Sequence, residues 1–309
     1  MKKLKAGVIG IGQLGQHHVR IYNELPEVDL IGICDVNKEK CEKAREYKVP
    51  FYDNYHELLN KVDFVSIATP TKLHYKIAKT FIENNIHVLI EKPITNSLTE
   101  ADELITLARE KKLFLRVGHI ERYNSAFRAV KKIAKKIKFI EIHRLGPFTP
   151  RISDCGVVLD LMIHDLDIIL TLLRSEIKYL DAVGINVLSK YEDIANARLK
   201  FENGAIANIT ASRLTPEKQR KIRIWQDDAY ISLDYQNQAG LIYRKEMFGI
   251  SKKEIDIQKE EPLRSELKDF IKAIVKISHE DRIDIDARNA LYVALQILDS
   301  IKENNKHLK

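Results

Sequence analysis

The chain has 309 residues, of which 45% are hydrophobic and 31% are charged, a composition typical of folded globular proteins and not of disordered ones. A single hydrophobic core stops growing at roughly 250–300 residues, so we expect two domains of ordinary size. The net charge of +7 suits an anionic ligand, either a dinucleotide or sugar phosphate or a nucleic acid.

Cysteine usage and hydropathy exclude several classes of protein. Cys34, Cys41 and Cys155 have no Cys-x-x-Cys spacing, so we expect neither a disulfide framework nor a zinc ribbon, and a reducing cytoplasm is the simplest location. No apolar stretch approaches the roughly 18 residues that a membrane helix needs. The chain starts with basic residues before an apolar run, as a signal peptide does. That run is short and ends in a glycine-rich turn, so it predicts a first strand instead.

Residues 1–120 alternate short, almost fully apolar runs with segments of helical periodicity. The apolar runs are 4–9, 28–34, 63–68, 86–90 and 113–117. The helical segments are 13–24, 37–47, 55–60, 72–84 and 98–111, the last with a capping box at Ser97-Leu-Thr-Glu100. Apolar strands that alternate with helices predict a parallel sheet covered on both faces, which is a doubly wound α/β domain.

The pattern changes after about residue 120. A helix is predicted at 123–137, a strand at 138–145 and an apolar helix at 156–174, and strands follow from 176 to 258. Tight turns are predicted at Glu202-Asn203-Gly204 and at Asp227-Asp228. Two amphipathic helices end the chain, near 262–279 and 285–304. We expect residues 121–309 to form an α+β domain on an open, mostly antiparallel sheet.

The densest basic cluster, the lysines between 131 and 138, lies along one side of the helix predicted at 123–137. The other side of that helix is apolar, so a solvated helix face explains the cluster better than a binding stripe. We therefore expect no nucleic acid partner.

Gly10-Ile11-Gly12-Gln13-Leu14-Gly15 has the G-x-G-x-x-G spacing, directly after the first predicted strand and at the start of a helix. In that context the glycines allow a tight turn and let the backbone approach a pyrophosphate at the helix N-terminus. Asp35 ends the second strand, where a carboxylate accepts hydrogen bonds from ribose hydroxyls and repels a 2′-phosphate. NAD is therefore favoured, although Lys38 and Lys40 keep NADP as an alternative. A purely structural glycine turn is the other alternative.

The helix predicted at 156–174 is apolar almost all the way round, yet Asp160, His164 and Asp167 share one side at i, i+4 and i+7. Such groups are costly in a core unless each is paired or faces a polar cavity. A functional cleft is favoured, with a satisfied polar cluster or domain-interface network as the alternative. We expect no metal site, since no other His, Cys or carboxylate cluster completes the coordination.

Glu91-Lys92-Pro93 follows the strand predicted at 86–90, at the carboxyl edge where doubly wound sheets bind ligands. A lysine there can donate a hydrogen bond to a substrate oxygen. The alternative is an ordinary Lys-Pro pair at a strand end.

Taken together, these motifs resemble the glucose–fructose oxidoreductase / inositol dehydrogenase family (Gfo/Idh/MocA) along the whole chain. The segments concerned are GVIGIGQLGQHH at 7–18, CD at 34–35, ATPTKLH at 68–74, EKP at 91–93 and GVVLDLMIHDLD at 156–167. The resemblance implies a six-stranded Rossmann domain and a second domain whose open sheet forms the contact of a homo-oligomer, a dimer or a tetramer. It also implies a cofactor site that includes Thr69, Pro70, His74 and Glu91, and a substrate site with Lys92, Asp160 and His164.

Within this family, the segments 117–130 and 143–167 resemble enzymes that act on UDP-N-acetylglucosamine at carbon 3. This implies oxidation of a secondary hydroxyl on a sugar or nucleotide-sugar ring, with Arg122, Tyr123 and Arg151 among the substrate contacts. Arg144 and Arg151 could serve a diphosphate, and surface or interdomain arginines are the alternative.

We expect His164 to take the hydroxyl proton, Asp160 to orient the imidazole and Lys92 to hydrogen-bond the reacting oxygen. An inositol or free-sugar dehydrogenase of the same family is an alternative function. A catalytically silent, dinucleotide-binding regulatory protein is another, but the intact set of Lys92, Asp160 and His164 argues against it.

Overall fold

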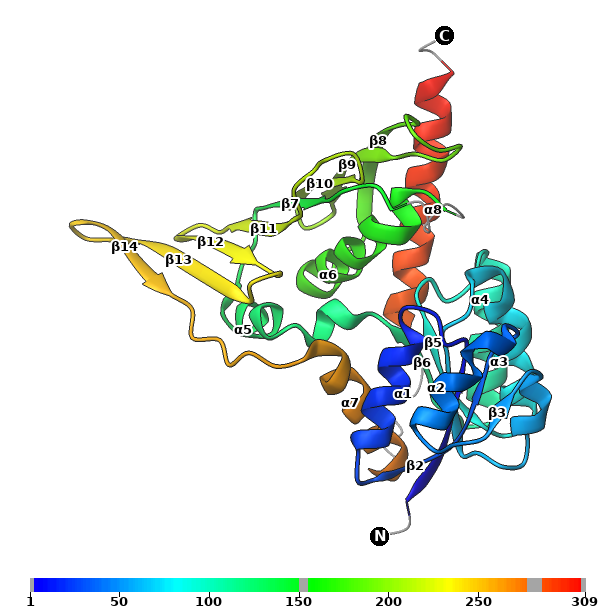
Figure 1. Ribbon diagram of the computed structural model, residues 1–309. Helices are drawn as coiled ribbons and strands as arrows, with labels where there is room; N and C mark the ends of the chain where they lie inside the picture. The colour runs from blue at the N-terminus through cyan, green and yellow to red at the C-terminus, as the bar shows by residue number, and fades with distance from the viewer. Residues whose placement is uncertain (1–2, 150–154, 277–284, 307–309) are drawn as a thin grey trace. The chain divides into compact units, whose positions relative to one another are not determined.

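The computed structural model of the protein describes residues 3–149, 155–276 and 285–306. It divides into two compact units. One comprises Met1–His119 and Leu263–Arg288, and the other comprises Ile120–Pro262 and Asn289–Lys309. Each unit has its own sheet (Figure 1).

The first unit is built on a six-stranded parallel sheet with the order β3-β2-β1-β4-β5-β6. Its strands are β1 (Leu4–Ile9), β2 (Val28–Cys34), β3 (Phe51–Tyr52), β4 (Phe64–Ile67), β5 (His87–Glu91) and β6 (Leu115–Gly118). This is the strand order of a Rossmann sheet, so the predicted doubly wound architecture is confirmed. β3 is absent from the sequence-based expectation because two residues are too few to show a strand pattern.

Four helices connect these strands: α1 (Gly15–Glu24), α2 (Cys41–Glu46), α3 (His74–Glu83) and α4 (Leu98–Glu110). α1 lies on one side of the strands, and α3 and α4 lie on the other (Figure 1). The predicted capping box is confirmed, since the Ser97 hydroxyl accepts a hydrogen bond from the Glu100 backbone N–H at 3.3 Å. The helix expected at 55–60 is only a 3₁₀ turn, Tyr55–Leu58, because the backbone becomes extended at Leu59.

The first unit also contains α7 (Pro262–Lys276), although the expected division assigns this part of the chain to the domain 121–309. Phe270 of α7 packs edge-on against Phe64 of β4, with ring centroids 5.6 Å apart. Arg264 forms an ion pair with Glu24 at the end of α1. These are contacts between residues far apart in the sequence, and an amphipathic pattern does not reveal which sheet a helix will cover.

The second unit is built on an eight-stranded sheet with the order β14-β13-β12-β11-β7-β10-β9-β8. Its strands are β7 (Phe139–Leu145), β8 (Ile177–Ile185), β9 (Ile194–Phe201), β10 (Ile206–Ser212), β11 (Gln219–Trp225), β12 (Ala229–Asp234), β13 (Ala239–Glu246) and β14 (Gly249–Glu254). Only β7 and β10 pair in parallel, so the predicted mostly antiparallel sheet is confirmed. Both predicted turns join hairpin strands, and Gly204 has a φ of +85°.

One face of this sheet forms the core of the second unit together with α5 (Ser125–Ile133), α6 (Ile163–Leu173) and α8 (Ile285–Asn305). α6 lies under this face in Figure 1. Alternate residues of each strand point into the core, for example Ile222 and Ile224 of β11, which are fully buried. The helix expected at 123–137 is shorter, because the backbone is extended at Ala134.

The opposite face of the sheet carries partly exposed side chains. An aromatic row crosses β7, β11, β12 and β13 there, formed by Phe139, Trp225, Tyr230 and Tyr243. Successive ring centroids in this row are 5.0, 5.1 and 5.5 Å apart, which is the spacing of interacting aromatic pairs. Across the described ranges, no helix combines the length and the apolar character needed to cross a membrane.

Candidate active site

The loop after β1 needs glycine at two of its three glycine positions. Gly10 has a φ of +82°, and a Cβ there would lie 2.7 Å from the carbonyl oxygen of Ala68. A Cβ on Gly15 would lie 1.8 Å from the carbonyl oxygen of Gly10. Gly12 has open space around it, so a ligand can approach its backbone. No side chain caps the N-terminus of α1, and that end of the helix therefore suits an anionic group.

The Asp35 carboxylate follows β2 directly and accepts three hydrogen bonds. Its Oδ2 accepts from the backbone N–H of Ile11 at 2.9 Å and from Lys40 Nζ at 2.8 Å, and its Oδ1 accepts from the backbone N–H of Asn37 at 2.9 Å. Burial would raise the pKa of Asp35, but these donors outweigh burial and hold the pKa below its usual value. The carboxylate is therefore ionised, and Oδ1 keeps acceptor capacity for a ribose hydroxyl.

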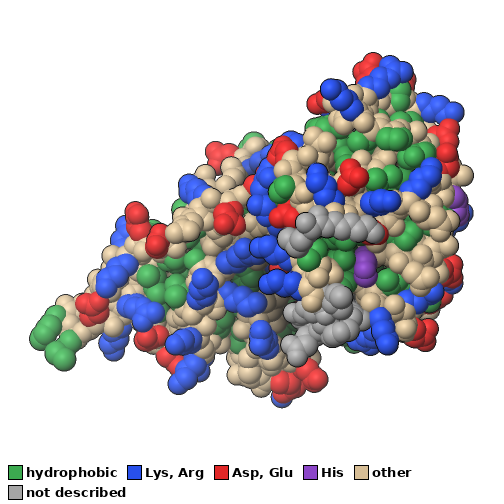
Figure 2. All heavy atoms as spheres, turned by 90° about the horizontal axis from the view of Figure 1, so that it is seen from below, with side chains coloured by type: hydrophobic (Ala, Val, Ile, Leu, Met, Phe, Trp, Pro, Cys, Tyr) green, Lys and Arg blue, Asp and Glu red, His purple; other side chains and the backbone are tan. Residues whose placement is uncertain are grey.

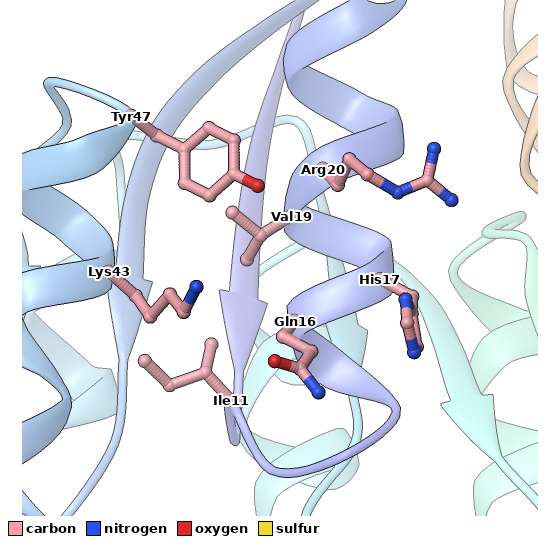
Figure 3. Close-up of a pocket in the computed structure, with 7 residues that line it drawn as sticks. All are labelled: Ile11, Gln16, His17, Val19, Arg20, Lys43 and Tyr47. Carbon is pink, nitrogen blue, oxygen red and sulfur yellow. The ribbon is translucent and has the colours of Figure 1, made fainter.

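The residues between the glycines have different surroundings. The Ile11 side chain lines a pocket of about 250 Å³ between α1 and α2, together with Gln16, Lys43 and Tyr47 (Figure 3). Leu14 immediately precedes α1 and is 45% exposed. The backbone N–H of Ile11 therefore binds Asp35, while its side chain lines this pocket.

His74, at the start of α3, joins two loops of the first unit. Its Nε2 lies 2.8 Å from the carbonyl oxygen of Thr69, and its Nδ1 lies 2.9 Å from the carbonyl oxygen of Pro93. Thr69 and Pro70 follow β4, and the Thr69 methyl group crowds Gly10. The Thr69 hydroxyl is buried without a partner among the described residues, which fits a site where a bound ligand supplies one.

Lys92 is partly buried, and both of its neighbours in the chain are held by histidines. Oε1 of Glu91 lies 3.0 Å from Nε2 of His18 on α1, and both side chains are buried. Burial would raise the pKa of Glu91, but the hydrogen bond and charge of His18 outweigh burial and lower the pKa. Pro93, joined to Lys92 by a cis peptide bond, is held by His74. These contacts fix the backbone that presents the Lys92 side chain.

In the second unit, a buried carboxylate holds the start of the helix predicted at 156–174. Glu192 Oε1 accepts a hydrogen bond from the backbone N–H of Val158 at 3.1 Å. A Cβ on Gly156 would lie 1.9 Å from the same oxygen, so any larger residue there would displace the Glu192 carboxylate. The helix then begins with a π-helical segment, Val158–Met162, before it continues as α6. Such segments are frequent at functional sites, and this one contains Asp160.

The four ionisable side chains of this helix divide by burial. Asp165 and Asp167 are 0% and 1% exposed, whereas Asp160 and His164 are partly exposed. Helical spacing groups Asp167 with Asp160 and His164, but Asp167 is buried whereas the other two side chains are partly exposed. The spacing assumes one regular α-helix, while a π-helical segment surrounds Asp160.

Arginines pair with both buried aspartates. Arg122 binds Asp167 with two nitrogens, one of them 2.7 Å from Oδ2. Arg144 is 3% exposed and donates to both oxygens of Asp165 at 2.8 Å and to Glu121 Oε1 at 2.9 Å. Arg144 is thus committed to the core and does not serve a diphosphate, because its guanidinium is buried between two carboxylates.

Three other residues were expected to contact the substrate: Arg122, Tyr123 and Arg151. Arg122 forms an ion pair with Asp167, and the Tyr123 ring lies under the Arg128 guanidinium at 4.9 Å. Contact of Arg122 and Tyr123 with the substrate stays a prediction. Arg151 lies outside the described residues. Within those residues, no group of three or more His, Cys, Asp or Glu side chains could hold a metal ion.

Sequence reasoning missed several residues that organise these sites: His18, Glu121 and Glu192. His18 comes three residues after Gly15, a position that could have been inspected because it faces the sheet on the first turn of α1. Nothing in the local sequence marks Glu121 or Glu192, since their partners are 23 and 34 residues away.

Comparison with known proteins gives family matches for both units. Residues 4–119 match a family described as an oxidoreductase family with an NAD-binding Rossmann fold, and residues 137–232 match the GFO/IDH/MocA C-terminal domain. The UDP-N-acetylglucosamine 3-dehydrogenase of Acidithiobacillus ferrooxidans is 36% identical over 96% of this chain and 97% of its own length. Its structure has a TM-score of 0.92 over 98% of this chain and 99% of that chain.

More distant relatives include the scyllo-inositol 2-dehydrogenase (NAD(+)) of Bacillus subtilis, 28% identical over 69% of this chain and 68% of its own. Another is the myo-inositol 2-dehydrogenase of Thermotoga maritima, 27% identical over 68% of this chain and 69% of its own. The TM-score of 0.92 shows that the Acidithiobacillus ferrooxidans enzyme has the same fold over nearly the whole chain. The chain therefore belongs to the GFO/IDH/MocA family of oxidoreductases.

Proposed function

We propose that the protein is an NAD-dependent dehydrogenase that oxidises the carbon 3 hydroxyl of UDP-N-acetylglucosamine. The observation that carries this proposal is the 36% identity to the Acidithiobacillus ferrooxidans enzyme over 96% of the chain. The two inositol dehydrogenases align over only 69% and 68% of the chain, at 28% and 27% identity. The similarity to the nucleotide-sugar enzyme thus includes parts of the chain that those alignments leave out.

Three side chains are proposed to act on the same hydroxyl group. His164 takes the hydroxyl proton, because imidazole is the side chain whose ordinary pKa lies closest to neutrality. Asp160 orients the imidazole and stabilises its charged form. Lys92 donates a hydrogen bond to the reacting oxygen and stabilises the negative charge that develops there. The nicotinamide ring, when bound, accepts the hydride.

The residues of the first unit suit a dinucleotide, and we propose NAD in preference to NADP. The glycine loop and the uncapped end of α1 would hold the pyrophosphate, and the Thr69 hydroxyl lacks a partner among the described residues. The ionised Asp35 would accept the ribose hydroxyls and repel a 2′-phosphate. Lys40 offsets part of this repulsion, whereas Lys38 pairs with Asp53 at 2.8 Å.

We also propose that the protein forms a dimer or a tetramer through the outer face of the second sheet. The aromatic row defined above lies on that face. Met247 and Phe248, at the tip of the β13–β14 hairpin, are 89% and 96% exposed, and the hydrophobic tip is visible in Figure 2. Exposed apolar side chains of this size favour association. The molar mass measured in solution by light scattering tests this, since a monomeric mass contradicts it.

A mass spectrometric assay tests the proposed reaction. The protein is incubated with NAD and UDP-N-acetylglucosamine, with an aminotransferase and glutamate added to draw off the ketone. A sugar nucleotide lighter by two hydrogen atoms, or its amino derivative, supports the proposal. Turnover of free inositol or glucose without turnover of the nucleotide sugar contradicts the substrate and favours the other family activity. No turnover of any of them favours a regulatory protein.

A further inference from the structure

Arg220, near the start of β11, lies beside the buried ion pairs of the second unit but forms no hydrogen bond with their side chains. It lies opposite Arg144 in the register of β11 with β7. Arg144 is buried and paired with Asp165 and Glu121, whereas the Arg220 side chain is 44% exposed. Among the described residues its only ion pair is with Glu121, with 3.9 Å between Nη1 and Oε1. That distance is too long for a hydrogen bond, so its guanidinium donors remain available.

The surroundings of Arg220 disfavour a positive charge. Burial and the neighbouring Arg144 lower the pKa of Arg220, and the nearby carboxylates, Asp160 among them, only partly offset this. An anion placed against this guanidinium would therefore gain more than one at an open surface, because the charge is partly shielded from water.

A cavity adjoins this arginine and has room for such an anion. Its volume is about 390 Å³, and Arg220, Lys218 and Lys221 line it together with Gln236 and Asn237. The size lies in the range of small-molecule sites, roughly 300–1,000 Å³. Neither Lys218 nor Lys221 forms an ion pair or a side-chain hydrogen bond with another described residue. Two acids, Glu217 and Asp234, also line the cavity, so its three basic side chains leave it with a net positive charge. Both oxygens of the Asp234 carboxylate already accept hydrogen bonds from Asn237.

A series of ion pairs leads from Arg220 to the helix that carries the proposed proton acceptor. Arg220 reaches Glu121, Glu121 binds Arg144, and Arg144 binds Asp165, the residue after His164. The charge of Asp160 also acts directly on the Arg220 guanidinium, so these two side chains lie near one another. We therefore expect a long ligand bound at Asp160 and His164 to reach this cavity with an anionic group. A guanidinium fits a phosphate with two parallel hydrogen bonds, whereas lysines add unspecific charge.

We propose that this cavity binds the diphosphate of the nucleotide-sugar substrate and that Arg220 is the side chain that holds it. The assignment of the diphosphate to a sugar substrate rests on the proposed function. Arg220 takes the role that the sequence suggests for Arg144, whose guanidinium is buried and saturated. Lys218 and Lys221 contribute the remaining positive charge.

Binding of UDP, measured by calorimetry in the presence of saturating NAD, tests the cavity without requiring turnover. NAD occupies the dinucleotide site, so that UDP is not counted there. The variant Arg220→Gln should bind UDP about tenfold to a hundredfold more weakly than the wild type, the scale of lost hydrogen bonds to a charged group. Lys218→Gln should have a smaller effect in the same direction. Arg244→Gln, an exposed arginine of β13 outside this cavity, is the matched control and should bind UDP as the wild type does.

Equal affinity of Arg220→Gln and the wild type for UDP would overturn the proposal, as would the absence of UDP binding to the wild type. A melting temperature equal to that of the wild type shows that Arg220→Gln is folded. In the turnover assay the same variant should raise KM for UDP-N-acetylglucosamine and largely keep kcat. If oxidation of the nucleotide sugar fails while UDP binding still depends on Arg220, the proposed function is wrong and the anion site stands.

Discussion

The two units hold their essential carboxylates in different ways. In the first unit, Asp35 binds Lys40, five residues further along the chain, and the backbone of the adjacent glycine loop. In the second unit, Asp165 binds Arg144, 21 residues away on another element. The first arrangement follows from the spacing of a local motif. The second depends on the packing of a strand against a helix. Burial, and not sequence spacing, therefore separates the structural acids Asp165 and Asp167 from the partly exposed Asp160.

The largest effect is expected from breaking the buried pairs of the second unit. Arg144→Met leaves the carboxylates of Asp165 and Glu121 buried without their counter-ion, which should lower the free energy of unfolding by about 3–5 kcal/mol. Denaturant unfolding followed by circular dichroism measures this loss. Arg198→Met, which removes an exposed arginine of β9, is the control and should change stability by less than about 0.5 kcal/mol. Similar losses in both variants would mean that the buried network is not a major source of stability.

The next effect concerns two partly exposed side chains, His164 and Lys92, which are proposed to act on the substrate hydroxyl. His164→Ala and Lys92→Ala should each lower turnover about a hundredfold or more, since a positioned acid–base group contributes on that scale. NAD binding, followed by fluorescence, should be nearly unchanged in His164→Ala. A wild-type rate and pH profile for His164→Ala would assign His164 to a satisfied polar cluster instead.

A smaller effect is expected from the histidine that holds Glu91 in the first unit. His18→Leu should lower kcat about tenfold, equivalent to about 1.4 kcal/mol, because Lys92 loses its fixed neighbour. Without His18, burial should raise the pKa of Glu91, so activity should be lost at a higher pH than in the wild type as the pH falls. His17→Leu, at the exposed neighbouring position, is the control.

His18→Gln should recover part of the His18→Leu loss, because an amide can still donate to the Glu91 carboxylate. In a Lys92→Ala background, His18→Leu should have little further effect on kcat, since it acts through Lys92. An unchanged pH profile in His18→Leu would contradict an effect of His18 on the pKa of Glu91 and would leave His18 with a packing role only.

The smallest effect concerns cofactor choice. Asp35→Ala removes the acceptor for the ribose hydroxyls and should weaken NAD binding about fivefold, equivalent to about 1 kcal/mol for one hydrogen-bonding group. The advantage of NAD over NADP should narrow at the same time, because the repulsion of the 2′-phosphate is lost. Titration of both cofactors into the wild type and the variant measures this. Tighter binding of NADP than of NAD to the wild type would contradict the assignment of NAD.

The sequence predicts the fold well where patterns are local. Apart from β3 and the 3₁₀ turn at Tyr55–Leu58, the strand and helix alternation of residues 1–120 appears as expected, as do the glycine loop and the capping box at Ser97. Each of these depends on residues within a few positions of one another. The placement of α7 in the first unit and the π-helical start of the 156–174 helix were not predictable in this way. Both depend on contacts with distant segments.

In the candidate site, too, local motifs could be predicted and contacts between distant residues could not. Asp35 and the loop at 10–15 could be assigned from spacing, because a dinucleotide motif lies within one strand–helix unit. For the buried arginine, the sequence suggested a diphosphate contact for Arg144, yet the carboxylates that saturate it come from other elements. Arg220 carries no sequence signal, and its availability appears only once the partners of Arg144 are known.

The transfer of hydrogen from carbon 3 tests the central claim most directly. The wild-type protein is incubated with NAD and UDP-N-acetylglucosamine that carries deuterium at carbon 3, and the reduced cofactor is examined by mass spectrometry. Our account predicts NADH that contains the deuterium, because the hydride leaves that carbon for the nicotinamide. NADH without deuterium, formed while the label stays in the sugar nucleotide, would contradict oxidation at carbon 3.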